Sequence, residues 1–178
     1  MSSANPIAGE NDLRITPRSL SDPAAIALIT ALNEELSATY PEPGATHFRL
    51  DPSEVGPGVG AFVVAECRGE PVACGAVRCL TDPGLAAELG AHVGEVKRMY
   101  VVPAMRGRGI ARRLLDRLEH EARALGLDRL VLETGTRQHA AIALYRRAGF
   151  VDIPPFGEYT ASPGTSVCLA KRLESVAS

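Results

Sequence analysis

Apolar positions recur along the chain with two different periods, which predict helices and strands respectively. Helical spacing follows Ser21-Asp22-Pro23, a typical helix start with a cap residue and an early proline, and continues to about residue 40. The same spacing predicts a second long helix over residues 107–125 and a third over 138–148. Single helical turns are expected at 52–55 and 85–89.

Short apolar runs bounded by glycine, proline and polar residues predict strands. These runs cover residues 13–16, 61–67, 72–79, 95–102, 129–134, 150–153 and 165–171. Arg68-Gly69-Glu70-Pro71 separates the second run from the third and predicts a hairpin. Because strands precede, alternate with and follow the helices, we expect an α/β or α+β layered domain with a mixed sheet.

The chain has 178 residues, a length that fits one domain. We expect residues 1–11 to form a disordered tail and 12–175 to form a single domain. No basic stretch followed by an apolar segment opens the chain, and no run of about 18 apolar residues occurs, so a cytoplasmic protein without a membrane segment is predicted. Cys67, Cys74 and Cys168 lie in apolar runs and are predicted to be buried, and neither they nor Cys79 show the spacing of a metal site.

Charge is unevenly distributed, although the net charge is only −2. Residues 1–60 carry three basic and eight acidic side chains, whereas residues 97–123 carry eight basic and three acidic ones. The overall balance argues against a nucleic-acid-binding protein, but the second stretch suits an anionic ligand.

A turn at Arg106-Gly107-Arg108-Gly109-Ile110-Ala111 joins a predicted strand to the second long helix. Its glycines allow a tight turn, and the first N–H groups of the helix, together with the helix dipole, favour a phosphate. The turn lacks both the Gly-Lys-Ser/Thr ending of a nucleoside-triphosphate loop and the third glycine of a dinucleotide fingerprint. A plain helix start with solvated arginines is the alternative.

Arg106-x-x-Gly109-x-Ala111 after a strand resembles the R/Q-x-x-G-x-G/A motif of the GCN5-related N-acetyltransferase (GNAT) family. MYVVP at 99–103 is similar to that family's fourth strand, and RLVLET at 129–134 with LYRRAGF at 144–150 is similar to its fifth strand and fourth helix. The resemblance covers about residues 60–153. It implies a mainly antiparallel sheet of about seven strands with about four helices, and a splayed strand pair that forms the cofactor cleft.

The resemblance also implies acetyl-CoA as donor, an amine as acceptor, and no metal. Backbone groups of Met99, Tyr100 and Val101 are expected to hold the pantetheine arm. The turn is expected to hold the pyrophosphate, through Arg106, Gly107, Arg108, Gly109, Ile110, Ala111 and Arg112. Arg108, Arg112 or Arg113 could reach the 3′-phosphate. Gln138 stands where the family often has an asparagine that contacts the cofactor, so a longer amide is expected to make this contact.

Acetyl transfer needs a neutral amine, while an alkylamine such as lysine has a pKa near 10.4 and is mostly protonated at neutral pH, so a base is useful. By resemblance, Glu95 and Glu133 are the candidates for this base, with Glu95 preferred. The alternative for Glu95 is an ion pair with Lys97 or Arg98. Tyr145 matches the family's general acid, which protonates the departing thiolate, and it also lies at the cofactor.

The acceptor is expected to bind near residues 40–59 and 154–164. These segments contain Glu42, His47, Phe48, Arg49, Asp51, Phe156, Glu158 and Tyr159. We predict transfer to a primary amine of a small molecule in a ternary complex. A non-catalytic acyl-CoA sensor, a protein or peptide acetyltransferase and a homodimer stay open, whereas RNA binding is disfavoured by the net charge.

Overall fold

The computed structural model describes residues 12–43 and 49–174. The predicted disordered tail, together with His47 and Phe48, lies outside these residues. The strands are β1 (Leu13–Pro17), β2 (Gly60–Cys67), β3 (Glu70–Cys79), β4 (Val93–Val101), β5 (Arg129–Gly135), β6 (Val151–Ile153) and β7 (Ser166–Arg172). The α-helices are α1 (Pro23–Thr39), α2 (Pro83–Leu89), α3 (Ile110–Ala124) and α4 (His139–Arg147). Short 3-10 helices are η2 (Pro52–Glu54), η3 (Pro103–Met105) and η4 (Gly157–Ala161).

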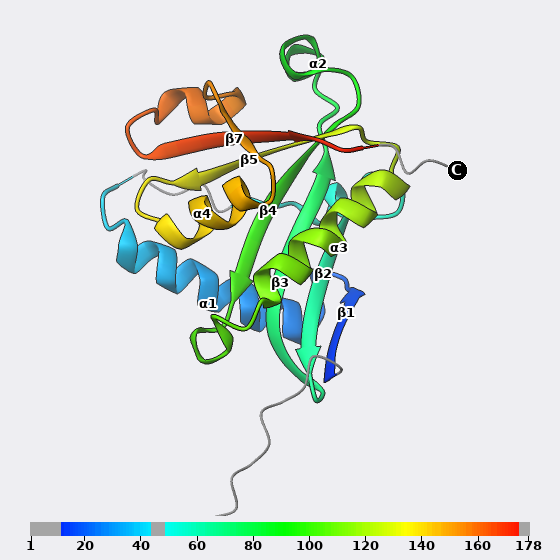
Figure 1. Cartoon of the computed structure of the whole chain (residues 1–178), viewed down its shortest axis with the longest axis vertical. Coiled ribbons are helices and arrows are strands. Elements are labelled where there is room, and N and C mark those ends of the chain that lie inside the picture. Colours follow the sequence, from blue (N-terminus) through cyan, green and yellow to red (C-terminus); the bar gives the residue numbers. More distant parts are fainter. Residues whose placement is uncertain (1–11, 44–48, 175–178) are drawn as a thin grey trace, which may run out of the picture.

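The strands form one seven-stranded sheet in the order β1-β2-β3-β4-β5-β7-β6 (Figure 1). Every neighbouring pair is antiparallel except β4 and β5, which are parallel. The predicted mixed, mainly antiparallel sheet with four helices is therefore confirmed. The segment expected to be a loop between the last two strands contains η4, which the apolar pattern did not predict.

Local chemistry explains where the first helix begins. Asp22 is the N-cap of α1, and its carboxylate accepts a hydrogen bond from the backbone N–H of Ala24 at 2.8 Å. Pro23 takes the first helical position, where its missing N–H costs nothing. The helix therefore begins where the sequence predicted.

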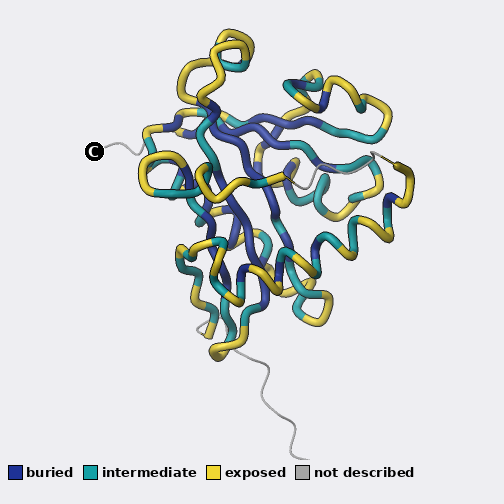
Figure 2. The backbone as a smooth tube through the Cα atoms, turned by 180° about the vertical axis from the view of Figure 1, so that it is seen from behind, coloured by how far each residue is buried: buried dark blue, intermediate teal, exposed yellow. Residues whose placement is uncertain are grey.

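Helices cover both faces of the sheet and create separate apolar layers. On one face, Leu114, Leu115 and Leu118 of α3 and Tyr145 of α4 pack against the strands. On the other face, α1 covers β2, β3 and β4, and a smaller cluster under α2 and η4 covers β5 and β7. Figure 2 shows the central strands in the colour of buried residues, while turns and outer helix faces are exposed. Burial on both faces explains the nearly continuous apolar runs of β2 and β3.

The two halves of the sheet separate at one end. β4 and β5 pair only from Val93↔Arg129 to Val96↔Leu132, and beyond these residues β4 pairs with β3 and β5 pairs with β7. Arg98, with a φ of 60°, forms a bulge in β4 just past the last pair with β5. The splay and the bulge leave backbone groups of β4 facing the gap.

Candidate active site

The turn between η3 and α3 lies at the mouth of the gap. Gly107 and Gly109 have φ values of 75° and 74°, in the left-handed region that favours glycine. Gly109 is the N-cap of α3, and no side chain within the described part of the chain caps this helix start. The first N–H groups of α3 are therefore left for another acceptor.

Arg106 braces this turn against two other elements. Its Nε donates to the carbonyl oxygen of Val101 at 2.9 Å, and its Nη2 pairs with Glu35 of α1 at 2.7 Å. The guanidinium carbon also lies 5.6 Å from the ring centroid of Tyr100. Arg106 thus joins the turn to β4 and to α1.

A cavity of about 680 Å³ opens beside the turn. It is lined by α1, the end of β4, the turn, the start of α3 and α4. The lining residues are Leu32, Glu35, Leu36, Met99, Tyr100, Val101, Met105, Arg106, Gly107, Gly109, Ile110, Ala111, Arg112, Gln138, Ala140, Ala141, Leu144, Tyr145 and Arg147. All residues predicted to contact the cofactor line this cavity except Arg108 and Arg113, which are exposed.

Tyr145 is buried at the inner side of this cavity and packs edge-on against Phe150, with 5.8 Å between ring centroids. Burial raises the pKa of Tyr145 above the ordinary tyrosine value, and the negative charge of Glu133 raises it further. The hydroxyl therefore keeps its proton at neutral pH and can donate it.

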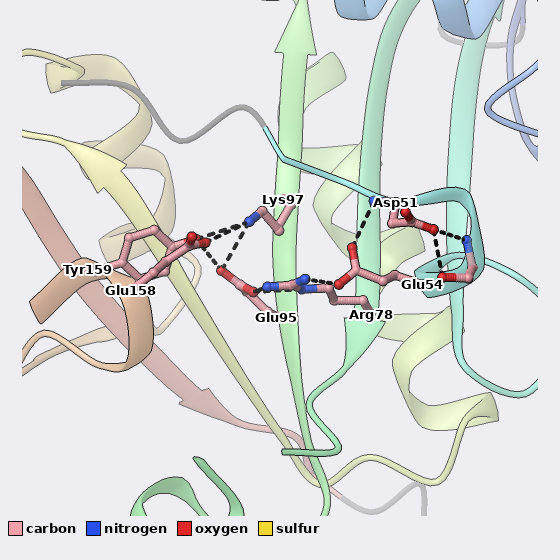
Figure 3. Close-up of polar contacts among 8 residues, drawn as sticks. Asp51, Glu54, Arg78, Glu95, Lys97, Glu158 and Tyr159 are labelled. Atoms are coloured by element: carbon pink, nitrogen blue, oxygen red, sulfur yellow. Dashed lines mark hydrogen bonds and ion pairs between the residues drawn. The ribbon is translucent and has the colours of Figure 1, made fainter. Parts of the chain in front are cut away.

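Glu95 lies within a network of polar side chains that includes Arg78, Lys97 and Tyr159 (Figure 3). Tyr159 belongs to the apolar cluster under α2 and η4, and not to the cluster that contains Tyr145. Its side chain is 1% exposed, and Arg78 donates to its Oε2 from Nε at 2.8 Å and from Nη2 at 2.6 Å. The Tyr159 hydroxyl donates to Oε1 at 2.5 Å. The predicted alternative, an ion pair, is present, but its closest partner is Arg78 of the neighbouring strand β3.

Of the two partners predicted for Glu95, Lys97 forms an ion pair with it, whereas Arg98 lies elsewhere. Lys97 Nζ is 3.9 Å from Glu95, but 3.2 Å from the Tyr159 oxygen and 3.5 Å from Glu158. Arg98 points to α1, where it donates to the side-chain oxygen of Asn33. The bulge at Arg98 breaks the alternation of the strand, so that spacing along the sequence could not identify these contacts.

Glu133 follows directly after the last residue of β5 that pairs with β4. It is partly buried, and its charge contributes to the raised pKa of both Tyr145 and Tyr159, for which burial is the larger cause. Glu133 is therefore close enough to influence both faces of the splay. Glu133 thus lies at the start of the gap, whereas Glu95 is paired with Val131 inside the β4–β5 ladder.

A second cavity, of about 430 Å³, lies beside Glu95 and η4. Its lining residues are Arg49, Glu54, Arg78, Cys79, Leu80, Thr81, Asp82, Leu85, Glu95, Phe156, Gly157, Glu158 and Tyr159. Of the residues expected on the acceptor side, Arg49, Phe156, Glu158 and Tyr159 line it. Glu42 instead pairs with Arg137, and Asp51 caps η2.

The basic stretch 97–123 does not act as one patch. Lys97 and Arg98 are buried, while Arg117 pairs with Glu121 at 2.6 Å and Arg123 with Glu119 at 3.4 Å. The arginines close to the turn are Arg106, Arg108, Arg112 and Arg113. The excess of positive charge available to a ligand is accordingly smaller than the composition of the stretch predicts.

The cysteines are all free thiols. Cys74 and Cys168 are buried, as predicted, and burial raises the pKa of Cys74 to about 12 and that of Cys168 to about 11. The prediction for Cys67 is wrong: it is only half-buried, because it ends β2 beside the hairpin turn. Among the described residues, no three His, Cys, Asp or Glu side chains form a group that could hold a metal ion. No helix in the same ranges is long and apolar enough to cross a membrane.

Comparisons with known proteins agree with this geometry. The model of the acetyltransferase (GNAT) family matches residues 26–150. An IAA acetyltransferase from Azospirillum brasilense is 44% identical over 140 residues, which cover 79% of this chain and 85% of that protein. A crystal structure assigned to the acyl-CoA N-acyltransferases, from Klebsiella pneumoniae, is 34% identical with a TM-score of 0.74, and the match covers 91% of this chain and 98% of that one.

A GNAT acetyltransferase from Elizabethkingia anophelis, solved with acetyl-CoA bound, shares the fold at a TM-score of 0.63 and 17% identity, over 92% of this chain and all of that one (100%). These similarities define the class of enzyme, an acetyl-CoA-dependent N-acetyltransferase. The chain belongs to the acetyltransferase (GNAT) family.

Proposed function

We propose that this protein transfers the acetyl group of acetyl-CoA directly to a primary amine of a small molecule, with both substrates bound at once. The observation that carries the proposal is the 680 Å³ cavity, which joins an uncapped helix start to a buried tyrosine at the splay. The turn would bind an anion at one end of a long ligand, and Tyr145 would lie at the other end. Acetyl-CoA has a diphosphate and a thioester separated in this way.

The proposed contacts to acetyl-CoA follow the cavity lining. The N–H groups of residues 107–112 would donate hydrogen bonds to the diphosphate, because they belong to the turn and the first turn of α3. Backbone groups of Met99 to Val101, next to the bulge, would hold the pantetheine arm, and Gln138 would contact it from α4. Arg108, Arg112 or Arg113 would neutralise the 3′-phosphate.

In the proposed reaction, the amine nitrogen attacks the thioester carbonyl carbon and forms the new C–N bond. The C–S bond then breaks, and Tyr145 donates its proton to the departing thiolate. Burial raises the pKa of the Tyr145 phenol, so it is protonated at neutral pH. The departing thiolate belongs to a thiol with an ordinary pKa near 8.5, and it can therefore accept a proton at the same pH. Coenzyme A and the amide are the products.

We propose Glu133 as the base that takes the proton from the attacking amine, directly or through water. Glu133 lies at the splay and its charge acts on Tyr145. Glu95 was the preferred candidate from sequence, and it remains the alternative. Its two oxygens, however, already accept hydrogen bonds from Arg78 and Tyr159, so a role as base would require one of these bonds to open.

The second cavity is the proposed acceptor side. Four carboxylates and two guanidinium groups line it, so the charge favours a cationic amine over an anionic molecule. The similarity to an IAA acetyltransferase supports an acceptor that is a small molecule.

The test is thiol release from acetyl-CoA with amino acids, polyamines, aminoglycosides and peptides as acceptors. We expect turnover with a small amine, and a kcat roughly 10²–10⁴-fold lower in Tyr145→Phe, the usual range for loss of an acid catalyst. Calorimetry on the same variant should show nearly unchanged affinity for coenzyme A. Binding without thiol release from any acceptor would instead support a sensor, and full activity of Tyr145→Phe would remove the acid role.

A further inference from the structure

Helix α1 is attached to both halves of the splayed sheet. On the β4 half, Asn33 accepts a hydrogen bond from Arg98, and Glu35 pairs with Arg106. On the β5 half, the residue that follows the helix, Tyr40, contacts the loop between β5 and α4. Figure 1 shows α1 running across the open end of the sheet, from beneath β2 and β3 toward the side where α4 lies.

The Tyr40 side chain packs tightly against Gly135 and Arg137. Tyr40 is 5% exposed, and its phenolic oxygen accepts the backbone N–H of Arg137 at 2.8 Å. Its ring lies against Gly135, where an added Cβ would come within 2.0 Å of the Tyr40 oxygen and 2.5 Å of Cζ. Only glycine at position 135 allows this approach.

Arg137 reinforces the same contact from outside. Its guanidinium lies 5.0 Å from the Tyr40 ring centroid, donates to the carbonyl of Thr39 at 2.7 Å and pairs with Glu42 at 2.6 Å. The end of α1 is thus held by the packing of the Tyr40 ring, by two hydrogen bonds from Arg137 and by one ion pair. All of them involve Gly135 or Arg137.

These two residues lie directly before α4 in the chain. Gly135 is the last residue of β5, and Arg137 precedes Gln138, the N-cap of α4. Since the β4–β5 ladder ends at Val96↔Leu132, no hydrogen bond between these two strands fixes the end of β5 relative to β4. The contact with α1 spans this gap instead.

We infer that Tyr40 is a positioning residue for acetyl transfer. By holding Gly135 and Arg137, it sets the distance between α4 and β4 across the cavity, and so places Tyr145 at the reacting thioester. This inference rests on the proposed function. The anion-binding turn belongs to the β4 half, and for that reason loss of the contact lowers the rate of transfer more than it weakens cofactor binding, to which α4 contributes through Gln138.

Two substitutions test the contact from its two sides. Tyr40→Phe keeps the ring and removes the acceptor of the Arg137 N–H, while Gly135→Ala pushes the ring away. Each is expected to lower kcat about tenfold or more, since small displacements of reacting groups have effects up to about 10²-fold. The KM for acetyl-CoA should change much less than kcat, because the turn that would hold the diphosphate is not displaced. Thr30→Ala, which removes an exposed hydroxyl bonded only to Ile26 of the same helix, is the matched control and should leave kcat unchanged.

A double variant distinguishes loss of positioning from general destabilisation of the protein. In Tyr40→Leu, neither the phenolic oxygen nor Cζ is present, so adding Gly135→Ala should lower kcat little further. Additive losses would contradict the inference, and so would an unchanged kcat in folded Tyr40→Phe and Gly135→Ala.

Hydrogen exchange tests the contact at Tyr40 independently of acetyl transfer. Peptides that cover 133–147 should exchange faster in Tyr40→Phe, with those of β2 and β3 unchanged. If the wild-type protein transfers no acetyl group, the proposed function fails, and this exchange pattern still decides whether Tyr40 holds α4. Equal exchange in both proteins would overturn the inference.

Discussion

Replacing Arg78 by methionine should separate the structural role of Glu95 from a catalytic one. Arg78 is 16% exposed at its side chain and Glu95 is 1% exposed, so this is a buried ion pair. Removing one partner of such a pair typically destabilises a protein by about 3–5 kcal/mol, because the other charge stays buried without compensation. In Arg78→Met, Glu95 would keep the Tyr159 hydroxyl and a lysine ammonium 3.9 Å away. We therefore expect the free energy of unfolding to fall by an amount within this range.

The second half of this experiment removes the charge that Arg78 compensates. In Arg78→Met/Glu95→Gln, a neutral amide oxygen can still accept the bond from Tyr159, Lys97 keeps Glu158 as its partner, and Glu54, the second partner of Arg78, loses the arginine in both variants alike. The double variant should therefore be markedly more stable than Arg78→Met alone. Urea unfolding measures both values, provided that the m-value is unchanged. The control is Arg146→Met, which breaks a pair with Asp152 whose side chains are 54% and 61% exposed, and which should cost less than about 1 kcal/mol.

Activity of Glu95→Gln completes the comparison. If Glu133 is the base, Glu95→Gln should keep kcat within a few-fold while Glu133→Gln loses roughly 10²-fold or more. A cost below about 1 kcal/mol for Arg78→Met, or no recovery in the double variant, would refute the assignment of Glu95 to a structural ion pair. Loss of turnover in Glu95→Gln with full activity in Glu133→Gln would move the base to Glu95.

Two further predictions follow from the turn and from the tyrosines. Gly109→Ala and Gly126→Ala place a Cβ at φ values of 74° and 76° with no atom within 4 Å, so both should destabilise the protein by about 1 kcal/mol, whereas only Gly109→Ala should weaken coenzyme A binding in calorimetry. Equal affinities in the two variants would contradict binding at the turn. All four tyrosines are buried, and burial raises the pKa of each, so the unfolded chain loses phenol protons first as the pH rises above about 10. Stability should therefore fall above that pH, by up to about 1.4 kcal/mol per pH unit for each tyrosine, and phenolate absorbance should appear together with unfolding and not before it.

The fold could be predicted from the sequence to the extent that its elements carry local signals. The apolar periods give the long helices and the seven strands, and Asp22 with Pro23 marks the start of α1. The strand order could not be derived in this way, because the parallel β4–β5 pair and its early end depend on contacts between distant residues. The resemblance to a family supplied that part.

The residues that line the first cavity could be predicted where a backbone motif marks them. The contacts between buried side chains could not be predicted. The turn at 106–111 and Tyr145 belong to recognisable patterns, and both line the first cavity apart from Arg108. Arg78 ends an apolar run and gave no sign that it would hold Glu95. Tyr40 was predicted as the end of a helix and the start of the acceptor-side segment 40–59. Its fit against Gly135 was missed, because that contact joins residues 95 positions apart in sequence.

The separation of the sheet into two halves has a consequence for how the enzyme can diversify. The turn proposed to bind the diphosphate lies in the half formed by β1 to β4, whereas η4, one wall of the proposed acceptor cavity, lies between β6 and β7 in the other half. On the proposed assignment, mutations in η4 can change which amine binds without altering the backbone that binds the donor. A lineage can therefore exchange one acceptor for another while its donor stays the same.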